Sequence, residues 1–230
     1  MGDKTFVERY LDFNKVNWLE IKQATIDTLY MAVISMIFTI ILGFILGLLL
    51  YTLSRRKTMG GKIAYSIISI VSNICRSIPY IILLVLLIPF TKALVGTMIG
   101  AKSVIPSLIV SATPFYARLV EVAFREVDSG VLEAADAMGA SLSEKILKVL
   151  LPESLPALLS GVTITSVSMI GYTAMGGVVG GGGLGGYAYQ QGYSLSNYSV
   201  VVVATVIILI MVFIIQFVGD TLVKRSDKRI

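Results

Sequence analysis

The stretch Thr28–Ser54 reads TLYMAVISMIFTIILGFILGLLLYTLS, contains no charged residue, and is followed at once by Arg55, Arg56 and Lys57. A helix needs about 20 mostly apolar residues to cross the hydrocarbon core of a bilayer, so this stretch predicts a membrane-spanning helix. Its apolar part is too long for a cleaved signal peptide, and the segment before it carries acidic as well as basic side chains. The stretch therefore predicts an all-α membrane protein.

The composition of the whole chain agrees with a bilayer as solvent. The 230 residues are 56% apolar and 14% charged, whereas about 25% of the residues of a soluble domain are charged. The chain has no His and one Cys, which excludes His metal ligands, His general bases and internal disulfides; the sequence predicts no metal site. The net charge of +5 lies in short clusters beside apolar runs, a pattern typical of membrane topology rather than of nucleic-acid binding.

Four further spans are expected, which makes five transmembrane helices in all; they cover about residues 63–91, 103–119, 157–177 and 198–223. The second span contains Arg76, and Pro79 predicts a kink just beyond it. Ser66, Ser69, Asn73 and Arg76 recur at helical steps as a polar stripe, which should face the protein interior or an aqueous path because lipid cannot solvate it. For Arg76, snorkelling to the cytoplasmic surface is an equal alternative.

The positions of Lys and Arg predict the orientation of these spans. With an external N-terminus, and with Arg76 left out, the first loop, the third loop and the C-terminal tail hold four basic residues each, 12 in total, against 6 outside. The positive-inside rule therefore favours an external N-terminus and a cytoplasmic C-terminus. Residues 1–24 are then an external interfacial segment, residues 25–223 the transmembrane domain, and residues 224–230 a basic cytoplasmic tail.

The third loop, predicted to be cytoplasmic, reads DSGVLEAADAMGASLSEKILKVLLP over residues 128–152. The pattern predicts two short helices joined at Gly139. Ser141 and Glu144 have the spacing of a capping box that starts the second helix, and Pro152 is expected to end it.

Several side chains of this loop suit contact with another protein. The small side chains of Ala134 and Ala135 would let a partner surface approach the backbone, and Glu133 and Asp136 place charge beside it. Further apolar contacts to a partner are expected from Leu132, Ile146, Leu147 and Val149. From these features alone, a docking loop and a folded loop without a partner are equally open.

The spacing of the loop residues is also that of a known motif. The pattern Glu133-Ala134-Ala135, three residues, Gly139, nine residues, Val149, one residue, Leu151-Pro152 resembles the EAA motif of ABC importer permeases, with Val where that pattern has Ile. The segments Arg76–Val85, Gly171–Gly177 and Gln216–Asp220 are similar to the methionine importer permease family (MetI-like). The resemblance implies the transmembrane domain of a type I ABC importer in the prokaryotic plasma membrane.

The resemblance also implies partners and residue roles. The permease would be a homodimer that works with two cytoplasmic ATPase subunits and an extracytoplasmic methionine-binding protein, importing D- or L-methionine. Coupling to the ATPase is assigned to Glu133, Ala134, Ala135, Gly139, Val149, Leu151 and Pro152, with Glu133 paired to a basic residue of the ATPase.

The pathway itself should be lined by polar or soft residues of the second and fourth spans. The candidates are Tyr172, Thr173, Met175, Arg76 and Pro79, with Ser166 and Ser168 as further positions. Met175 could form an apolar constriction that excludes water in one state. For each of these residues, ordinary helix packing is the competing interpretation.

The run Gly176–Gly186 lacks the Lys of a phosphate-binding loop, so the chain is predicted to be non-catalytic and to hold no cofactor, with ATP and Mg²⁺ bound by the partner ATPase. The glycines predict flexible or tightly turned backbone, with a gate hinge as a functional alternative. Gly43 and Gly47 predict a close-packing face first and a dimer contact second. The alternative functions are a permease for another small amino acid or peptide, or a secondary transporter, although the last two spans contain no ionisable residue for ion coupling.

Overall fold

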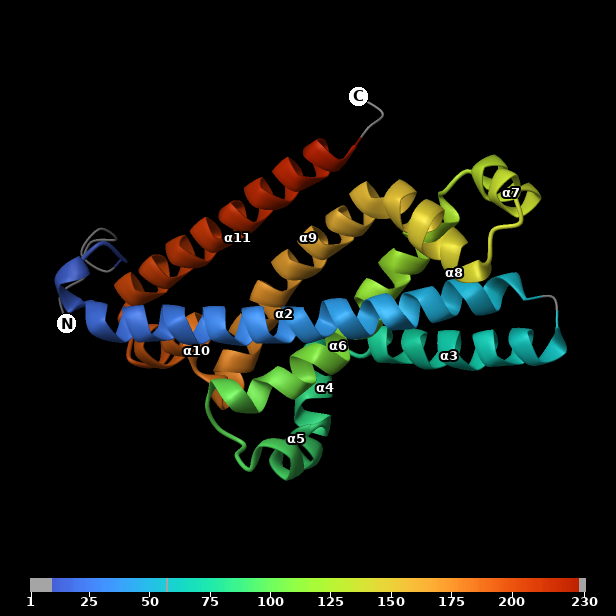
Figure 1. Cartoon of the computed structure of the whole chain (residues 1–230). Coiled ribbons are helices and arrows are strands. Elements are labelled where there is room, and N and C mark those ends of the chain that lie inside the picture. The colour runs from blue at the N-terminus through green and yellow to red at the C-terminus, as the bar shows by residue number, and fades with distance from the viewer. Residues whose placement is uncertain (1–9, 57, 228–230) are drawn as a thin grey trace. The chain divides into compact units, whose positions relative to one another are not determined.

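The computed structural model describes residues 10–56 and 58–227, and within these ranges the chain is helical without any strand (Figure 1). The elements are η1 Phe13–Lys15, α2 Trp18–Arg55, α3 Met59–Ser77, α4 Tyr80–Leu86, α5 Ile88–Val95, α6 Ala101–Arg125, α7 Ser129–Ala137, α8 Leu142–Glu144, η2 Lys145–Leu150, α9 Leu151–Gly176, η3 Gly177–Gly181, α10 Gly183–Tyr187, η4 Ala188–Ser194 and α11 Tyr198–Ser226. The predicted all-α class is confirmed. Part of the predicted external segment (1–9), Lys57 of the first basic cluster and the end of the predicted tail (228–230) lie outside the described residues.

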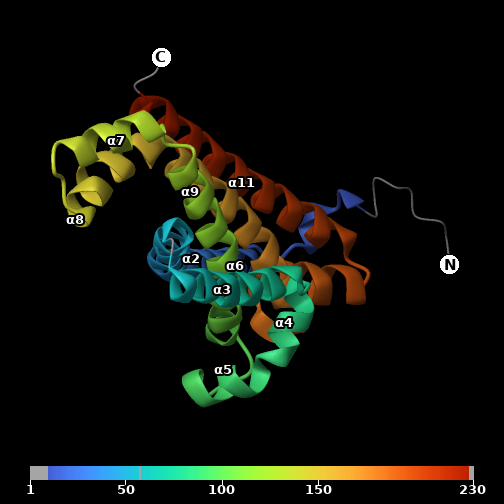
Figure 2. The ribbon, with the colours of Figure 1, turned by 90° about the vertical axis from the view of Figure 1, so that its right-hand side faces the viewer.

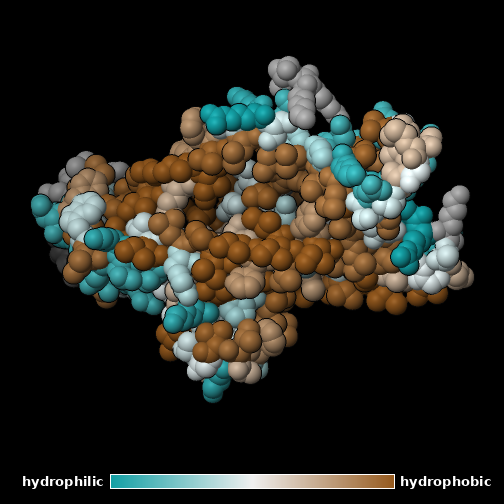
Figure 3. Space-filling view, viewed as in Figure 1, coloured by the Kyte–Doolittle hydropathy of each residue, from teal (hydrophilic) through white to brown (hydrophobic). Residues whose placement is uncertain are grey.

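Among the described residues, four helices are long and apolar enough to cross a membrane: α2, α6, the continuous helical run Leu142–Gly181, and α11. They contain the predicted spans 28–54, 103–119, 157–177 and 198–223. The surface of α2 is accordingly brown over most of its length in Figure 3, which marks hydrophobic residues. A fifth crossing exists only when α3 and α4 are counted together as one bent pair.

The predicted second span, residues 63–91, is not one helix. Helix α3 ends at Ser77, α4 begins after Pro79, and the two helices are bent by 105° at this break. A second interruption follows at Leu87, after which α5 begins with Pro89 in its first turn. Proline supplies no N–H to a helix and keeps the preceding residue out of the helical conformation. At Pro79 the helix therefore breaks, where the sequence predicted only a kink.

The chain divides into two compact units. Unit 1 comprises the described parts of residues 1–38, 78–111 and 166–215, and unit 2 those of residues 39–77, 112–165 and 216–230. Each of the four long helical segments α2, α6, α9 and α11 contributes residues to both units.

Unit 2 has an aromatic core centred on Phe124 of α6. The ring of Phe124 is fully buried, with the rings of Phe44 and Tyr51 from α2 at centroid distances of 5.9 and 5.5 Å. The same core takes up buried leucines from three later segments, α7, η2 and α9: Leu132, Leu150 and Leu158. The helices α2 and α6 and the loop that follows α6 therefore share one core.

Gly43 and Gly47 bring α2 close to α6. A Cβ atom on Gly47 would lie 2.6 Å from the carbonyl oxygen of Ala117 and 2.6 Å from the Cβ of Val120. A Cβ on Gly43 would lie 2.8 Å from the ring of Tyr116. These distances leave no room for a side chain, so the predicted close-packing face is confirmed, and the surface it packs on is α6 of the same chain.

The glycine-rich run Gly176–Gly186 belongs to unit 1 and forms a tightly packed turn. A Cβ on Gly185 would collide with the backbone of Ala174 in α9. The N–H of Leu184 donates a hydrogen bond of 2.8 Å to the hydroxyl of Thr28 in α2, which fixes the start of α10. The expectation of tightly turned backbone is confirmed, and the gate hinge stays a prediction.

Candidate functional site

Residues 128–152, called the EAA loop below, contain α7, α8 and η2 and connect α6 to α9 (Figures 1 and 2). Asp128 caps α7 by accepting a hydrogen bond of 2.6 Å from the N–H of Gly130. Leu132 and Ala135 are 7% and 2% exposed, and Leu132 belongs to the aromatic core of unit 2. One face of α7 is thereby fixed inward, and the other face is left outside.

The C-terminal end of α7 explains why a glycine stands at position 139. Gly139 has a φ of +76°, in the left-handed region. Its N–H donates to the carbonyl of Asp136 at 3.0 Å, and the N–H of Ala140 donates to the carbonyl of Ala135 at 3.0 Å. These two bonds form a Schellman motif, which ends α7 sharply and satisfies carbonyl groups that the helix leaves unpaired.

The second half of the loop begins with the predicted capping box, which is confirmed. The N–H of Glu144 donates to the Ser141 hydroxyl at 3.4 Å, and the N–H of Ser141 donates to the Glu144 carboxylate at 3.0 Å. Lys148 donates to the same carboxylate at 3.0 Å. Lys145, at the start of η2, donates to Asp136 of α7 at 2.5 Å and so joins the two halves of the loop.

The expectation that Pro152 ends the second helix is wrong. The chain runs without interruption from α8 through the π-helical turn η2 into α9, and Pro152 lies in the first turn of α9. Inside this continuous helix, the π turn directly before Pro152 changes the backbone pairing where the proline supplies no N–H. The hydroxyl of Ser154 donates to the carbonyl of Leu150 at 2.7 Å within this region.

The structure divides the seven predicted coupling residues into two groups. Glu133 and Ala134 are exposed on the outer face of α7, and Gly139 and Pro152 are also exposed. The other three motif residues, Ala135, Val149 and Leu151, are buried or half-buried, the last two against the aromatic core. Ala135 is therefore not part of an accessible docking surface.

The apolar contacts expected between the loop and a partner need a similar correction. Leu132 is buried in the core, and Ile146 and Val149 pack against it, so these three side chains anchor the loop instead. Among the four predicted contacts Leu147, at 63% exposure, is the most accessible to a partner. The loop sequence alone did not show which apolar side chains face inward, because the core they pack against is supplied by α2 and α6.

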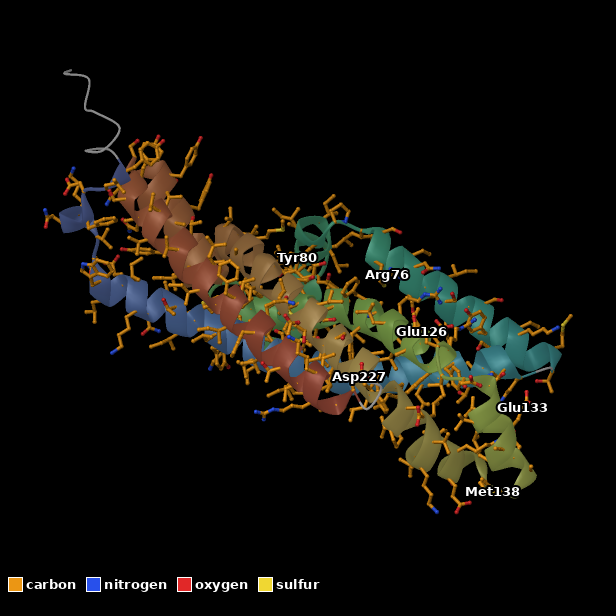
Figure 4. The ribbon with its side chains drawn as sticks, turned by 90° about the horizontal axis from the view of Figure 1, so that it is seen from above. Arg76, Tyr80, Glu126, Glu133, Met138 and Asp227 are labelled. Atoms are coloured by element: carbon orange, nitrogen blue, oxygen red, sulfur yellow. The ribbon has the colours of Figure 1, made fainter. Side chains whose placement is uncertain are left out.

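Three exposed apolar residues of the loop were missed, among them Val131 of α7, which is 43% exposed. Met138 is 81% exposed at the end of α7, and Leu142 is 60% exposed at the start of α8. Figure 4 labels Glu133 on α7 and Met138 just after its end, and the surface of the loop in Figure 3 mixes hydrophilic and hydrophobic patches. The signal for Met138 was its place directly before Gly139, where a helix ends and a side chain is left unpacked.

A buried ion-pair cluster next to the loop was also missed. The Glu121 side chain of α6 is 1% exposed and accepts hydrogen bonds from Arg118 at 2.7 Å and from Arg125 at 2.6 Å. The hydroxyl of Tyr65 in α3 donates to the same carboxylate at 3.1 Å, which ties α3 to α6. The signal was the spacing of Glu121, three residues after one arginine and four before the other.

Within the described residues, no group of three or more His, Cys, Asp or Glu could hold a metal ion.

The pathway candidates of α9 lie in unit 1 and differ in exposure. Met175 is 49% exposed, whereas Thr173 is 1% exposed and donates to the carbonyl of Ile170 at 2.7 Å. The ring of Tyr172 stacks on the ring of Tyr80, the first residue of α4, with 4.9 Å between the ring centroids. The hydroxyls of Tyr80 and of the buried Ser107 in α6 are hydrogen-bonded at 3.3 Å. Thr173 therefore packs inside the chain, while Met175 is accessible.

Arg76 and Pro79 lie on either side of the break between α3 and α4. Arg76 is exposed in the last turn of α3, in unit 2, and Figure 4 shows it on that helix. Pro79 caps the start of α4 in unit 1. Pro79 thus has a structural role at the start of α4, whereas the side chain of Arg76 is left open to its surroundings.

Residues 39–230 match the family described as binding-protein-dependent transport system inner membrane component. The chain belongs to this family. It is the membrane permease of an importer and a multi-pass protein of the inner membrane. The family predicted from the EAA motif is thereby confirmed.

Relatives of the permease have similar length and fold. It is 52% identical over 222 residues to the methionine import system permease protein MetP of Bacillus subtilis (strain 168), with 96% of this chain and 99% of that one covered. It is 46% identical over 151 residues to the D-methionine transport system permease protein MetI of Escherichia coli (strain K12), with 66% and 70% covered. Its structure matches a chain of the inward-facing MetNI methionine ABC transporter with a TM-score of 0.87 at 43% identity, covering 91% and 97%.

Proposed function

We propose that two copies of the permease form the translocation pathway for methionine, as the D or the L isomer. An extracytoplasmic binding protein delivers the amino acid, and two cytoplasmic ATPase subunits, which bind ATP and Mg²⁺, supply the energy. The relatives named as methionine permeases and the MetNI structure support the substrate and the partners. In this arrangement the permease chain itself performs no catalysis and needs no cofactor.

The outer face of α7 is the observation that carries the coupling role. Glu133 and Ala134 are exposed there, while Leu132 of the same helix is held in the core of unit 2. A small side chain beside a carboxylate gives a partner close access to the backbone and one charge to pair with. We propose that the EAA loop lies in the cytoplasm, with the N-terminus outside, and that Glu133 pairs with a basic residue of the ATPase.

The proposed cycle is a two-state switch biased by ATP. When ATP closes the ATPase subunits, the docked EAA loops move together and the pathway changes from inward-facing to outward-facing. The binding protein then releases its amino acid into the pathway, and hydrolysis resets the inward-facing state. Tyr172 and Met175 are the proposed constriction between the two sides.

Reconstituted transport tests the proposed function directly. The permease is purified with its ATPase and binding protein, placed in proteoliposomes, and assayed for ATP-dependent uptake of labelled methionine against competing amino acids. Uptake that requires ATP and is blocked by methionine, but not by other amino acids, is expected. Uptake selective for a different amino acid or a peptide would replace methionine as the substrate, and gradient-driven uptake without ATPase would revive the secondary transporter.

Reversing the charge at Glu133 tests the coupling role. Like charges that meet at an interface cost several kcal/mol, so Glu133→Arg should weaken binding of the ATPase by at least about tenfold and reduce uptake in proportion. The matched control is Glu126→Arg, because Glu126 is an exposed acid of unit 2 outside the motif. Normal ATPase binding and normal uptake by an assembled Glu133→Arg variant would show that the coupling residue is misassigned.

A further inference from the structure

One side of helix α3 is an exposed apolar face. The large apolar side chains on this face are between 53% and 59% exposed and recur at steps of three and four: Ile63, Ile67, Ile70, Val71 and Ile74. On a helix these positions share one side, so this face suits the hydrocarbon of the bilayer. A different side, with Tyr65 bonded to Glu121, packs on α6.

A third face of α3 is polar and is exposed in the part of the chain that the structure describes. Ser66, Asn73 and Arg76 are exposed, and Ser69 is partly exposed. Within the described residues, these four side chains make no hydrogen bond or ion pair with any other group. The polar stripe predicted from the sequence therefore exists, and the interior of the single chain is not what it faces.

Arg76 is also too far along α3 to reach the membrane surface beside the first basic cluster. It follows Lys62 by 14 residues, which corresponds to about 21 Å along a helix with a rise of 1.5 Å per residue. The hydrocarbon core is about 30 Å thick, so this distance puts Arg76 nearer the opposite side of the membrane, and its side chain is too short to reach back to the surface beside Lys62. Arg76 therefore needs water or an anionic partner at its own position, in the last turn of α3.

We propose that the polar face of α3 lines a water-filled passage through the permease, and that Arg76 binds the carboxylate of the amino acid as it passes. This inference rests on the proposed homodimeric importer. A dry contact between two copies of this face would bring two arginines together without a carboxylate on the face to neutralise them, whereas a passage lets water solvate both.

The chemistry of the face fits a zwitterionic amino acid. A guanidinium offers a planar fork of donors that matches the two oxygens of a carboxylate. Asn73 lies three residues before Arg76 on the same face, and its side-chain oxygen can accept a hydrogen bond from the α-ammonium group of the same molecule. Arg76 and Asn73 would bind the α-carboxylate and α-ammonium groups, which all amino acids share. The choice between amino acids with different side chains must therefore be made elsewhere, by other residues or by the binding protein.

Thiol accessibility tests whether the face is wet. Cys75 is the only cysteine of the chain, so a Cys75→Ala variant gives a cysteine-free background. Ser66→Cys and Asn73→Cys are compared with the lipid-facing controls Ile67→Cys and Ile74→Cys in the reconstituted permease–ATPase complex, with a charged, membrane-impermeant methanethiosulfonate. Labelling of the polar-face cysteines at least about tenfold faster than the controls is expected, and equal rates would overturn the passage.

Binding measurements test the role of Arg76. Methionine and methioninamide, which lacks the carboxylate, are bound to the purified permease–ATPase complex without the binding protein. A hydrogen-bonded charge pair is lost in Arg76→Gln, so methionine should bind about 10- to 100-fold more weakly, with Arg76→Lys in between. Methioninamide should bind equally to all three proteins. Equal methionine binding by wild type and Arg76→Gln would overturn the assignment.

Two additional measurements distinguish carboxylate binding from lipid binding and from transport of a different substrate. The binding series is repeated in phosphatidylcholine and in phosphatidylglycerol vesicles, because an arginine that holds a lipid phosphate would show an Arg76→Gln effect that depends on the lipid; that result would overturn carboxylate binding. If the wild-type importer transports an amino acid other than methionine, the proposed substrate fails, and the Arg76 test is run with that amino acid and its amide. The thiol labelling needs no substrate, so its outcome stands apart from the proposed function.

Discussion

The cluster around Glu121 gives the sharpest prediction for stability. Glu121→Gln keeps the shape of the side chain but removes its charge and turns one acceptor oxygen into a donor NH2 group, which then faces an arginine N–H. One charge-assisted hydrogen bond is worth about 1.5–3 kcal/mol. The side chains of Arg118 and Arg125 are 44% and 46% exposed, so they regain water, which holds the loss below the 3–5 kcal/mol of a fully buried broken pair. We expect a loss of about 2 kcal/mol, or about 30-fold in the folding equilibrium.

Reversible unfolding of the purified permease in mixed micelles, titrated with sodium dodecyl sulfate, measures this loss. The control is Glu126→Gln, an exposed acid five residues further along, which should change the unfolding free energy by less than about 0.5 kcal/mol. Tyr65→Phe should cost about 1 kcal/mol, and the double variant should lose less than the sum, because both changes remove the same hydrogen bond. Equal stability of the Glu121→Gln and Glu126→Gln proteins would refute the reasoning.

Three other predictions follow from single positions. Gly139→Ala should lower stability by about 1–2 kcal/mol in the same unfolding assay because φ is +76°, and Gly139→Asn should lower it less, since asparagine tolerates this region and no atom lies within 4 Å of an added Cβ. Gly47→Val should cost about 3 kcal/mol or more because it collides with α6, whereas Gly60→Val, which meets nothing within 4 Å, should cost about 1 kcal/mol or less. Met175→Ala should let labelled methionine leak through proteoliposomes in the absence of ATP, and an unchanged leak would count against Met175 as a constriction.

The long helices could be predicted because one physical requirement governs them. A span has to be apolar over about 20 residues, and α2 and α11 meet this requirement with few interruptions. The Gly43–Gly47 spacing likewise predicted close packing, because only glycine allows backbones to approach so closely. The membrane spans and the glycine contact both depend on local composition, which can be seen in the sequence itself.

The break at Pro79 and the two faces of the EAA loop could not be predicted in the same way. A proline indicates that a helix is disturbed, but whether the helix kinks or breaks depends on what packs around it. Here Tyr80, the residue after the proline, is held by stacking on Tyr172. In the loop, Leu132 and Val149 face inward because they pack against an aromatic core that α2 and α6 supply, and the loop's own sequence does not show where that core lies. Non-local packing decided both cases.

The EAA motif has exposed residues on one side and residues packed in the core on the other, and from this we infer how the loop would pass a movement on to the helices. Leu132 and Leu150 are each buried in the core of unit 2, and burial of a leucine is worth about 1.5–3 kcal/mol. Sliding α7 off this core would expose at least one of them, and the Asp136–Lys145 pair and the Schellman turn at Gly139 restrain it further. A displacement applied at Glu133 therefore costs less when the core moves with α7 than when α7 moves alone. Because α2 and α6 share that core, we expect a displacement of α7 to be passed on to these two helices.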